Sequence, residues 1–121
     1  MKTKNKDPSI IYICSPYSGN TARGAEIARR YSRYVVERGY APVTPHLYLP
    51  LFISEETERE LALGAGHRLL DMCSELWAYG GTISEGMRRE ISHAQRKGIP
   101  IRYVKEEEIY VRDRKRTEED Q

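Results

Sequence analysis

The apolar run Ile10-Ile11-Tyr12-Ile13-Cys14 decides the fold, because it opens a regular alternation of strand-like and helix-like segments. A short run of β-branched and aromatic residues between polar segments is typical of a buried strand. Residues 15–20, Ser-Pro-Tyr-Ser-Gly-Asn, have the composition of a loop. From residue 21 to residue 38 apolar side chains return at helical spacing, and Gly39 suits the end of a helix. The chain therefore begins with a predicted strand, loop and helix.

The alternation continues to residue 104. Residues 40–43, 75–79 and 100–104 are predicted strands, and residues 84–98 form a predicted helix between the last two. A further helix is predicted from an N-cap at Ser54 to about Cys73, because Glu55 and Glu56 would lie in its first turn. Its expected inner face consists of Leu61, Ala65, Leu69 and Met72. This order predicts an α/β fold: a single-domain, Rossmann-like (flavodoxin-like) parallel sheet of four to five strands flanked by helices.

Length and composition limit the domain organisation and the class of protein. With 121 residues the chain is long enough for one domain, predicted at 10–104 between an N-terminal extension (1–9) and a charged C-terminal tail (105–121). The net charge of +2 argues against a nucleic-acid binder. There is no apolar run of about 18 residues and no secretory signal pattern, so we expect a cytoplasmic protein without membrane contact. Neither metal-ligand spacing nor a GxGxxG or P-loop motif occurs, so no metal or cofactor is expected.

Glu90 occupies a position where an ordinary helix would carry an apolar residue. Met87, Glu90, Ile91 and Ala94 follow the spacing of one buried helical stripe. A glutamate is rarely buried without a partner, because removing its charge from water is costly. An inward-facing carboxylate therefore indicates a functional site, and the alternative is a partly exposed glutamate paired with an arginine.

Ligands of open parallel sheets bind at the carboxyl ends of the strands, here the loops 15–20, 44–53 and 80–84. The first loop offers hydroxyl and backbone N–H groups before a helix, although any turn has this composition; its candidate binding residues are Ser15, Pro16, Tyr17, Ser18 and Gly19. Ser84 and Gly86 form a possible phosphate cradle at a helix N-terminus, and simple helix capping is the alternative.

Four other residues have both a functional and an ordinary explanation. His46 follows a strand end and is either part of the site or solvated. Tyr12 is either a site residue or a core residue whose hydroxyl is hydrogen-bonded elsewhere. His67 and Asp71 lie one helical turn apart and form either a proton relay or a pair of surface residues.

These motifs resemble the nucleoside 2-deoxyribosyltransferase superfamily, in particular its small, often phage-borne members. The resemblance covers residues 10–104 and rests on Ile11-Tyr12-Ile13-Cys14-Ser15 and on the pattern Ser84-x-Gly86-x-x-x-Glu90-Ile91-x-x-Ala94. It implies that Glu90 is a nucleophile attacking the anomeric carbon of a nucleoside or nucleotide, with Tyr12 orienting it. It further implies that Ser84 and Gly86 hold a 5′-phosphate, that residues 15–19 wrap the sugar or phosphate, and that His46 lies near the site.

The resemblance also shows one departure, because the relatives carry a second catalytic acid where this chain has His67. Asp71, one turn away, is the possible substitute. Two functions therefore remain open: an N-glycosidic bond hydrolase or deoxyribosyltransferase, or a catalytically weak or inactive module that binds a nucleotide-like ligand. Relatives are dimers or larger, so a homodimer or higher homo-oligomer is expected, with residues 48–52 as an interface or a lid.

Overall fold

A computed structural model describes residues 9–17 and 21–109 of the chain. Four strands form one parallel sheet in the order β2-β1-β3-β4. The strands are β1 (Ile10–Cys14), β2 (Ala41–Val43), β3 (Glu75–Tyr79) and β4 (Ile101–Val104). The helices are α1 (Ala22–Glu37), α2 (Arg59–Asp71) and α3 (Glu85–Lys97), with the short 3₁₀ helices η2 (Pro45–Leu47) and η3 (Leu49–Leu51). The predicted α/β fold with a parallel sheet and flanking helices is confirmed.

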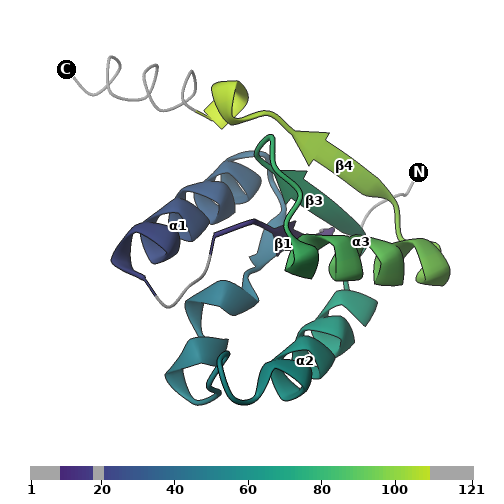
Figure 1. Ribbon diagram of the computed structural model, residues 1–121. Coiled ribbons are helices and arrows are strands. Elements are labelled where there is room, and N and C mark those ends of the chain that lie inside the picture. Colours follow the sequence, from purple (N-terminus) through teal and green to yellow (C-terminus); the bar gives the residue numbers. More distant parts are fainter. Residues whose placement is uncertain (1–8, 18–20, 110–121) are drawn as a thin grey trace.

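The helices cover the sheet from both sides, with α1 on one face and α2 and α3 on the other (Figure 1). Side chains of β1 alternate between these two layers because successive residues of a strand point to opposite faces. Ile11 and Ile13 pack in the core cluster of α1, whereas Tyr12 and Cys14 pack in the cluster of α2 and α3. The alternation of β1 therefore directs the Tyr12 hydroxyl and the Cys14 thiol toward the face of the sheet that α2 and α3 cover.

The start and end of α3 follow their sequence signals. The Ser84 hydroxyl accepts a hydrogen bond from the backbone N–H of Met87 at 3.2 Å, which caps the helix. Gly98 ends the helix with a φ of 74°, a conformation that glycine adopts without the steric cost of a side chain. Met87, Ile91 and Ala94 are buried as predicted, so the helical stripe that contains Glu90 does face the sheet.

The prediction for α2 was wrong in its start and in its inner face. Ser54 opens only a turn: the Glu58 N–H donates to the Ser54 carbonyl at 2.8 Å, and the helix begins at residue 59. Leu61 and Met72, expected inside, are 59% and 72% exposed. The fully buried residues of the helix are Gly66 and Leu70, so α2 approaches the sheet through a small residue.

Residues 1–8 and 110–121, which make up most of the expected extension and tail, lie outside the described residues. The segment after β4 begins within the fold, since Ile109 joins the core and the Tyr34 hydroxyl donates to Glu108 at 2.7 Å.

In the region 48–52, Leu51 is 81% exposed and Phe52 is 66% exposed. None of the helices within residues 9–17 and 21–109 has the length and apolar character needed to cross a membrane.

Candidate functional site

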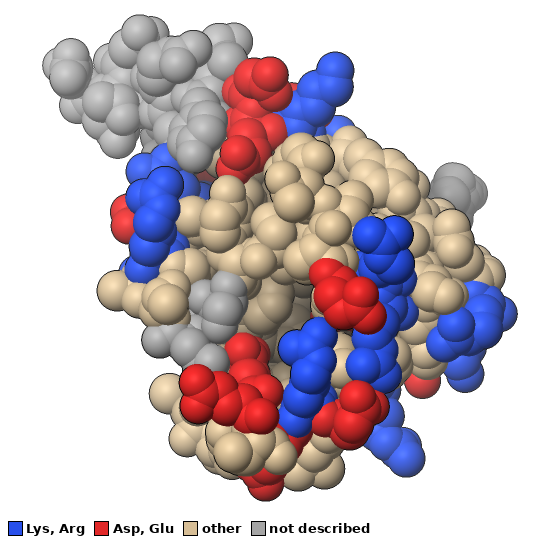
Figure 2. Space-filling model, viewed as in Figure 1, with Lys and Arg blue, Asp and Glu red and all other residues tan. Residues whose placement is uncertain are grey.

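A cavity of about 310 Å³ opens at the carboxyl ends of the strands, where β1 and β3 send their chains to opposite faces of the sheet. Its walls come from the loop after β1, from η2 and η3, from the first half of α2 and from the N-terminus of α3. Figure 2 shows the hollow near the middle of the molecule, with acidic and basic side chains at its rim. The volume is at the lower end of the range for pockets that enclose small organic ligands.

The Glu90 carboxylate lines this cavity and is held from behind by β1. The Tyr12 hydroxyl donates a hydrogen bond to Oε2 at 2.7 Å, and the Cys14 thiol donates to Oε1 at 3.3 Å. Both donors are fully buried, whereas Glu90 itself is only partly buried. Each carboxylate oxygen thus has a donor on β1, which fixes the orientation of the carboxylate relative to the cavity.

The environment of Glu90 acts on its charge in two opposite directions. Burial raises the pKa of the Glu90 carboxyl above its ordinary value, and the hydrogen bonds from Tyr12 and Cys14 partly offset this effect. Burial, reinforced by the nearby carboxylate, raises the pKa of both Tyr12 and Cys14. Both therefore keep their protons near neutral pH and act as hydrogen-bond donors.

Gly66 allows α2 to close over Tyr12. A Cβ on Gly66 would lie 3.1 Å from the Tyr12 hydroxyl oxygen, which is tighter than nine in ten real Cβ contacts. A Cβ on Gly64, two residues earlier in α2, would meet nothing within 4 Å. The absence of a side chain at residue 66 therefore leaves the space in which the Tyr12 hydroxyl reaches Glu90.

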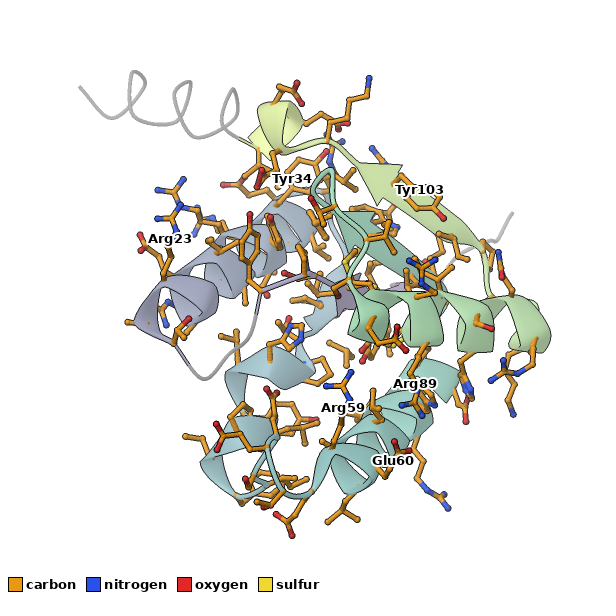
Figure 3. The ribbon with its side chains drawn as sticks, in the orientation of Figure 1. Arg23, Tyr34, Arg59, Glu60, Arg89 and Tyr103 are labelled. Atoms are coloured by element: carbon orange, nitrogen blue, oxygen red, sulfur yellow. The ribbon has the colours of Figure 1, made fainter. Side chains whose placement is uncertain are left out.

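Three charged or titratable residues, His46, Glu55 and Arg59, line the cavity from η2, from the turn before α2 and from the start of α2. His46 has a buried Nδ1 with no hydrogen-bond partner among the described residues, and burial lowers its pKa despite the opposing effect of Glu55. Arg59 extends from the start of α2 toward the sheet (Figure 3). It forms no ion pair with any residue that the structure describes. This wall thus offers an imidazole, a carboxylate and a cation to a ligand.

The N-terminus of α3 and the loop after β1 line the cavity beside Glu90. Ser84, Glu85 and Gly86 are lining residues, and the Ser84 Oγ already caps the helix by accepting from Met87. Ser15 accepts a hydrogen bond from the Tyr17 N–H at 3.2 Å, which stabilises the loop, and Pro16 also lines the cavity. Of the predicted loop residues, Ser18 and Gly19 lie outside the described residues.

Comparison with known proteins identifies the domain that carries this site. A family model described as a domain of unknown function, DUF7768, matches residues 9–104. The chain belongs to the DUF7768 family. The match includes all four strands, the three long helices and Glu90 with both of its β1 donors. No curated protein matches the chain.

Two predicted catalytic residues of this DUF7768 domain do not line the cavity. The Asp71 carboxylate contacts His93 of α3 at 2.6 Å, and the ring of His67 stacks on His93 with centroids 4.3 Å apart. His67 and Asp71 are thus joined through His93, away from the cavity. The position of Asp71 does not support it as the substitute for the second acid. Within the described part of the chain, no group of three or more potential ligands is placed to hold a metal ion.

Several residues that line the DUF7768 site or hold Glu90 in it were not predicted from the sequence. Cys14 follows Tyr12 by two residues, and side chains two residues apart in a strand point to the same face. The position of Cys14 beside Glu90 is therefore predictable from the strand pattern. Gly66 and Arg59 had no comparable signal, because the position of α2 relative to β1 depends on tertiary packing. Glu55 was interpreted as part of a helical turn rather than of a ligand-binding wall.

Proposed function

We propose that this protein cleaves or transfers the N-glycosidic bond of a nucleoside or nucleotide, with Glu90 as the nucleophile. The observation that carries the proposal is the Glu90 carboxylate, oriented by Tyr12 and Cys14 at the edge of a cavity of small-ligand size. Breaking an N-glycosidic bond generates positive charge on the sugar, and an adjacent carboxylate stabilises this charge and can form a covalent intermediate.

In the proposed reaction, one oxygen of the ionised Glu90 attacks the anomeric carbon. The bond from this carbon to the base nitrogen breaks, its electron pair leaves with the base, and a glycosyl ester of Glu90 forms. Attack by water then releases the free sugar, whereas attack by a second base yields a new nucleoside. The donors on Tyr12 and Cys14 stabilise the ionised nucleophile before attack and the carboxylate that leaves afterwards.

The departing base needs a proton, and the cavity restricts where this proton comes from. Among the described residues, the cavity-facing side of α2 carries no carboxyl group; it consists of Arg59, Ala62, Leu63 and Gly66. The remaining acids of the cavity are Glu55 and Glu85, and His46 is the titratable imidazole. In this proposal one of these three groups, and neither His67 nor Asp71, acts as the general acid.

The substrate is placed by the same lining residues. The N-terminus of α3 presents backbone N–H groups near Ser84 and Gly86, and helix N-termini favour anions. Arg59 adds a cation to the opposite wall. In this proposal the substrate is a nucleoside monophosphate that binds with its phosphate at the N-terminus of α3 and its anomeric carbon over Glu90.

Direct measurement of base release tests this function. The full chain is incubated with a panel of ribo- and deoxyribonucleosides and their 5′-monophosphates, and free base is separated and quantified. The matched control is Glu90→Gln, which keeps the size of the side chain and removes its nucleophilic charge. We expect release by the native chain and loss of release by at least about a hundredfold in the variant, in line with the loss of a covalent nucleophile. Equal release by both proteins would refute the role of Glu90.

The second candidate is a binding module that retains a nucleotide-like ligand without turning it over. The observation that favours it is the absence of a carboxyl group from the described cavity face of α2, since loss of a general acid slows such reactions by about 10²–10⁴-fold. Calorimetric titration with the same panel distinguishes the two functions. Binding of one compound without release of its base supports the module, and binding followed by release supports the enzyme.

A further inference from the structure

A second hollow lies on the outer side of the molecule, in the groove between α2 and α3. Its volume is about 290 Å³, and its lining residues are His67, Arg88, Arg89, Ser92 and Arg96. Three of these five side chains are arginines, and Figure 2 shows basic side chains, interrupted by acidic ones, beside the central hollow. Neither this groove nor its arginines take part in the proposed cleavage reaction.

Two acidic residues near the groove, Glu60 and Asp71, are already paired with basic residues. The charge of Glu85, one turn before Arg89 on α3, also acts on Arg89. The Arg89 guanidinium donates to both carboxylate oxygens of Glu60 at 3.1 Å, an arrangement visible in Figure 3. Asp71 contacts His93 at 2.6 Å and has Lys97 at 4.0 Å. Arg88 and Arg96 form no ion pair with any residue that the structure describes, so the groove retains an excess of positive charge.

The groove contains polar side-chain groups that are held in place but have not satisfied all of their hydrogen bonds. Arg96 donates from Nη1 to the Ser92 Oγ at 2.9 Å, which holds both side chains at the groove. The Nε2 of His67 is buried and has no hydrogen-bond partner among the described residues. The His67 ring stacks on His93, and burial together with the charges of His93, Arg89 and Arg96 lowers its pKa. A buried ring nitrogen in a positive field is suited to an incoming anion.

We propose that the groove between α2 and α3 binds a phosphate group. Guanidinium groups bind phosphate through paired, charge-assisted hydrogen bonds, and a serine hydroxyl and an imidazole N–H complete the usual donor set. The ligand is inorganic phosphate or the phosphate of a small monoester. Its contacts come from Arg88, Arg96 and Ser92 at the groove, with His67 beneath them. This site is separate from the cavity of Glu90.

Titration with inorganic phosphate, followed through the ring resonances of His67 and His93, tests the site in the full chain. The variant Arg88→Gln/Arg96→Gln removes the two unpaired cations, and Arg23→Gln/Arg29→Gln removes the same charge from exposed positions of α1. We expect saturable shifts of both rings in the native chain and in the α1 control. In the groove variant the affinity falls by about tenfold or more, since charged hydrogen bonds are lost. An unchanged affinity in the groove variant, or an equal loss in the control, overturns the proposal.

Two further ligands identify the source of the phosphate. Tighter binding of deoxyribose 5-phosphate than of inorganic phosphate assigns the groove to a phosphorylated metabolite, and the reverse order assigns it to the free ion; both support the site. A DNA oligonucleotide that shifts the two rings while neither small ligand does so would overturn the site in favour of a nucleic-acid surface. Because the readout is ring resonances, the result does not depend on whether Glu90 cleaves any substrate.

Discussion

Replacement of Tyr12 by phenylalanine removes one hydroxyl from the candidate site and leaves the aromatic ring in the core. The lost contact is the 2.7 Å hydrogen bond to Oε2 of Glu90. A hydrogen bond to a charged group contributes about 1.5–3 kcal/mol. Because this bond is stronger to the ionised carboxylate than to the protonated carboxyl group, its loss reduces the ratio of ionised to protonated Glu90, by up to about ten- to a hundredfold at a given pH. The pKa of Glu90, already raised by burial, therefore moves further upward in Tyr12→Phe.

The assay is an NMR titration of the glutamate carboxyl carbons, with Glu90→Gln used to assign the Glu90 signal. It measures the ionisation of Glu90 directly and requires no substrate. Where base release is detected, the acid limb of its pH profile should move in the same direction, because the nucleophile must be ionised. A Glu90 titration in Tyr12→Phe that coincides with the native curve, or that moves toward lower pH, would refute this account of the site.

Three further predictions concern the same surroundings. Gly66→Ala should displace the Tyr12 hydroxyl, because the new Cβ lies 3.1 Å from it, and so raise the pKa of Glu90; the control Gly64→Ala should leave that titration unchanged and gain roughly 0.5–1 kcal/mol of helix stability. Equal titrations in the two variants would contradict the role of Gly66. Cys14→Ala should raise the pKa of Glu90 by less than Tyr12→Phe does, since a thiol is a weak donor, and a larger effect in the same titration would be inconsistent with the geometry. Glu90→Gln should raise the free energy of unfolding in urea at neutral pH. The carboxyl pKa is higher in the folded state, so ionisation destabilises the fold as pH rises, and the gain should vanish below about pH 4. A variant less stable than the native chain at neutral pH would contradict this reasoning.

The sequence predicted those parts of the fold whose signals are local. Helix α3 was correctly bounded because Ser84 and Gly98 act on their immediate neighbours through a cap and a left-handed turn. Helix α2 was not, because the Ser54 turn contains the same residue types as a helix start but does not continue as a helix. Its inner face was misjudged since large apolar residues were expected inside, whereas Leu61 is exposed and Gly66 is buried.

The candidate site shows the same division between local and tertiary information. The inward direction of Glu90 followed from its place in the helical stripe, and its hydrogen bond to Tyr12 agrees with the contact that the resemblance implied. Spacing along one helix left open whether His67 and Asp71 form a relay or are surface residues, and in the structure both side chains contact His93 of α3. Such a contact depends on how two helices pack, which no spacing within α2 could predict.

The hydrogen bond between Tyr12 and Glu90 joins residues 78 positions apart. Both residues line the cavity, so its walls come from the first and the last third of the domain. A ligand that touches both β1 and α3 therefore binds only when these distant segments have come together. Such a ligand stabilises the native chain by about 2.7 kcal/mol at a hundred times its dissociation constant, which corresponds to several degrees in the melting temperature. Thermal-shift screening of nucleosides, nucleotides and sugar phosphates thus offers a search for the natural ligand that needs no assumption about the chemistry.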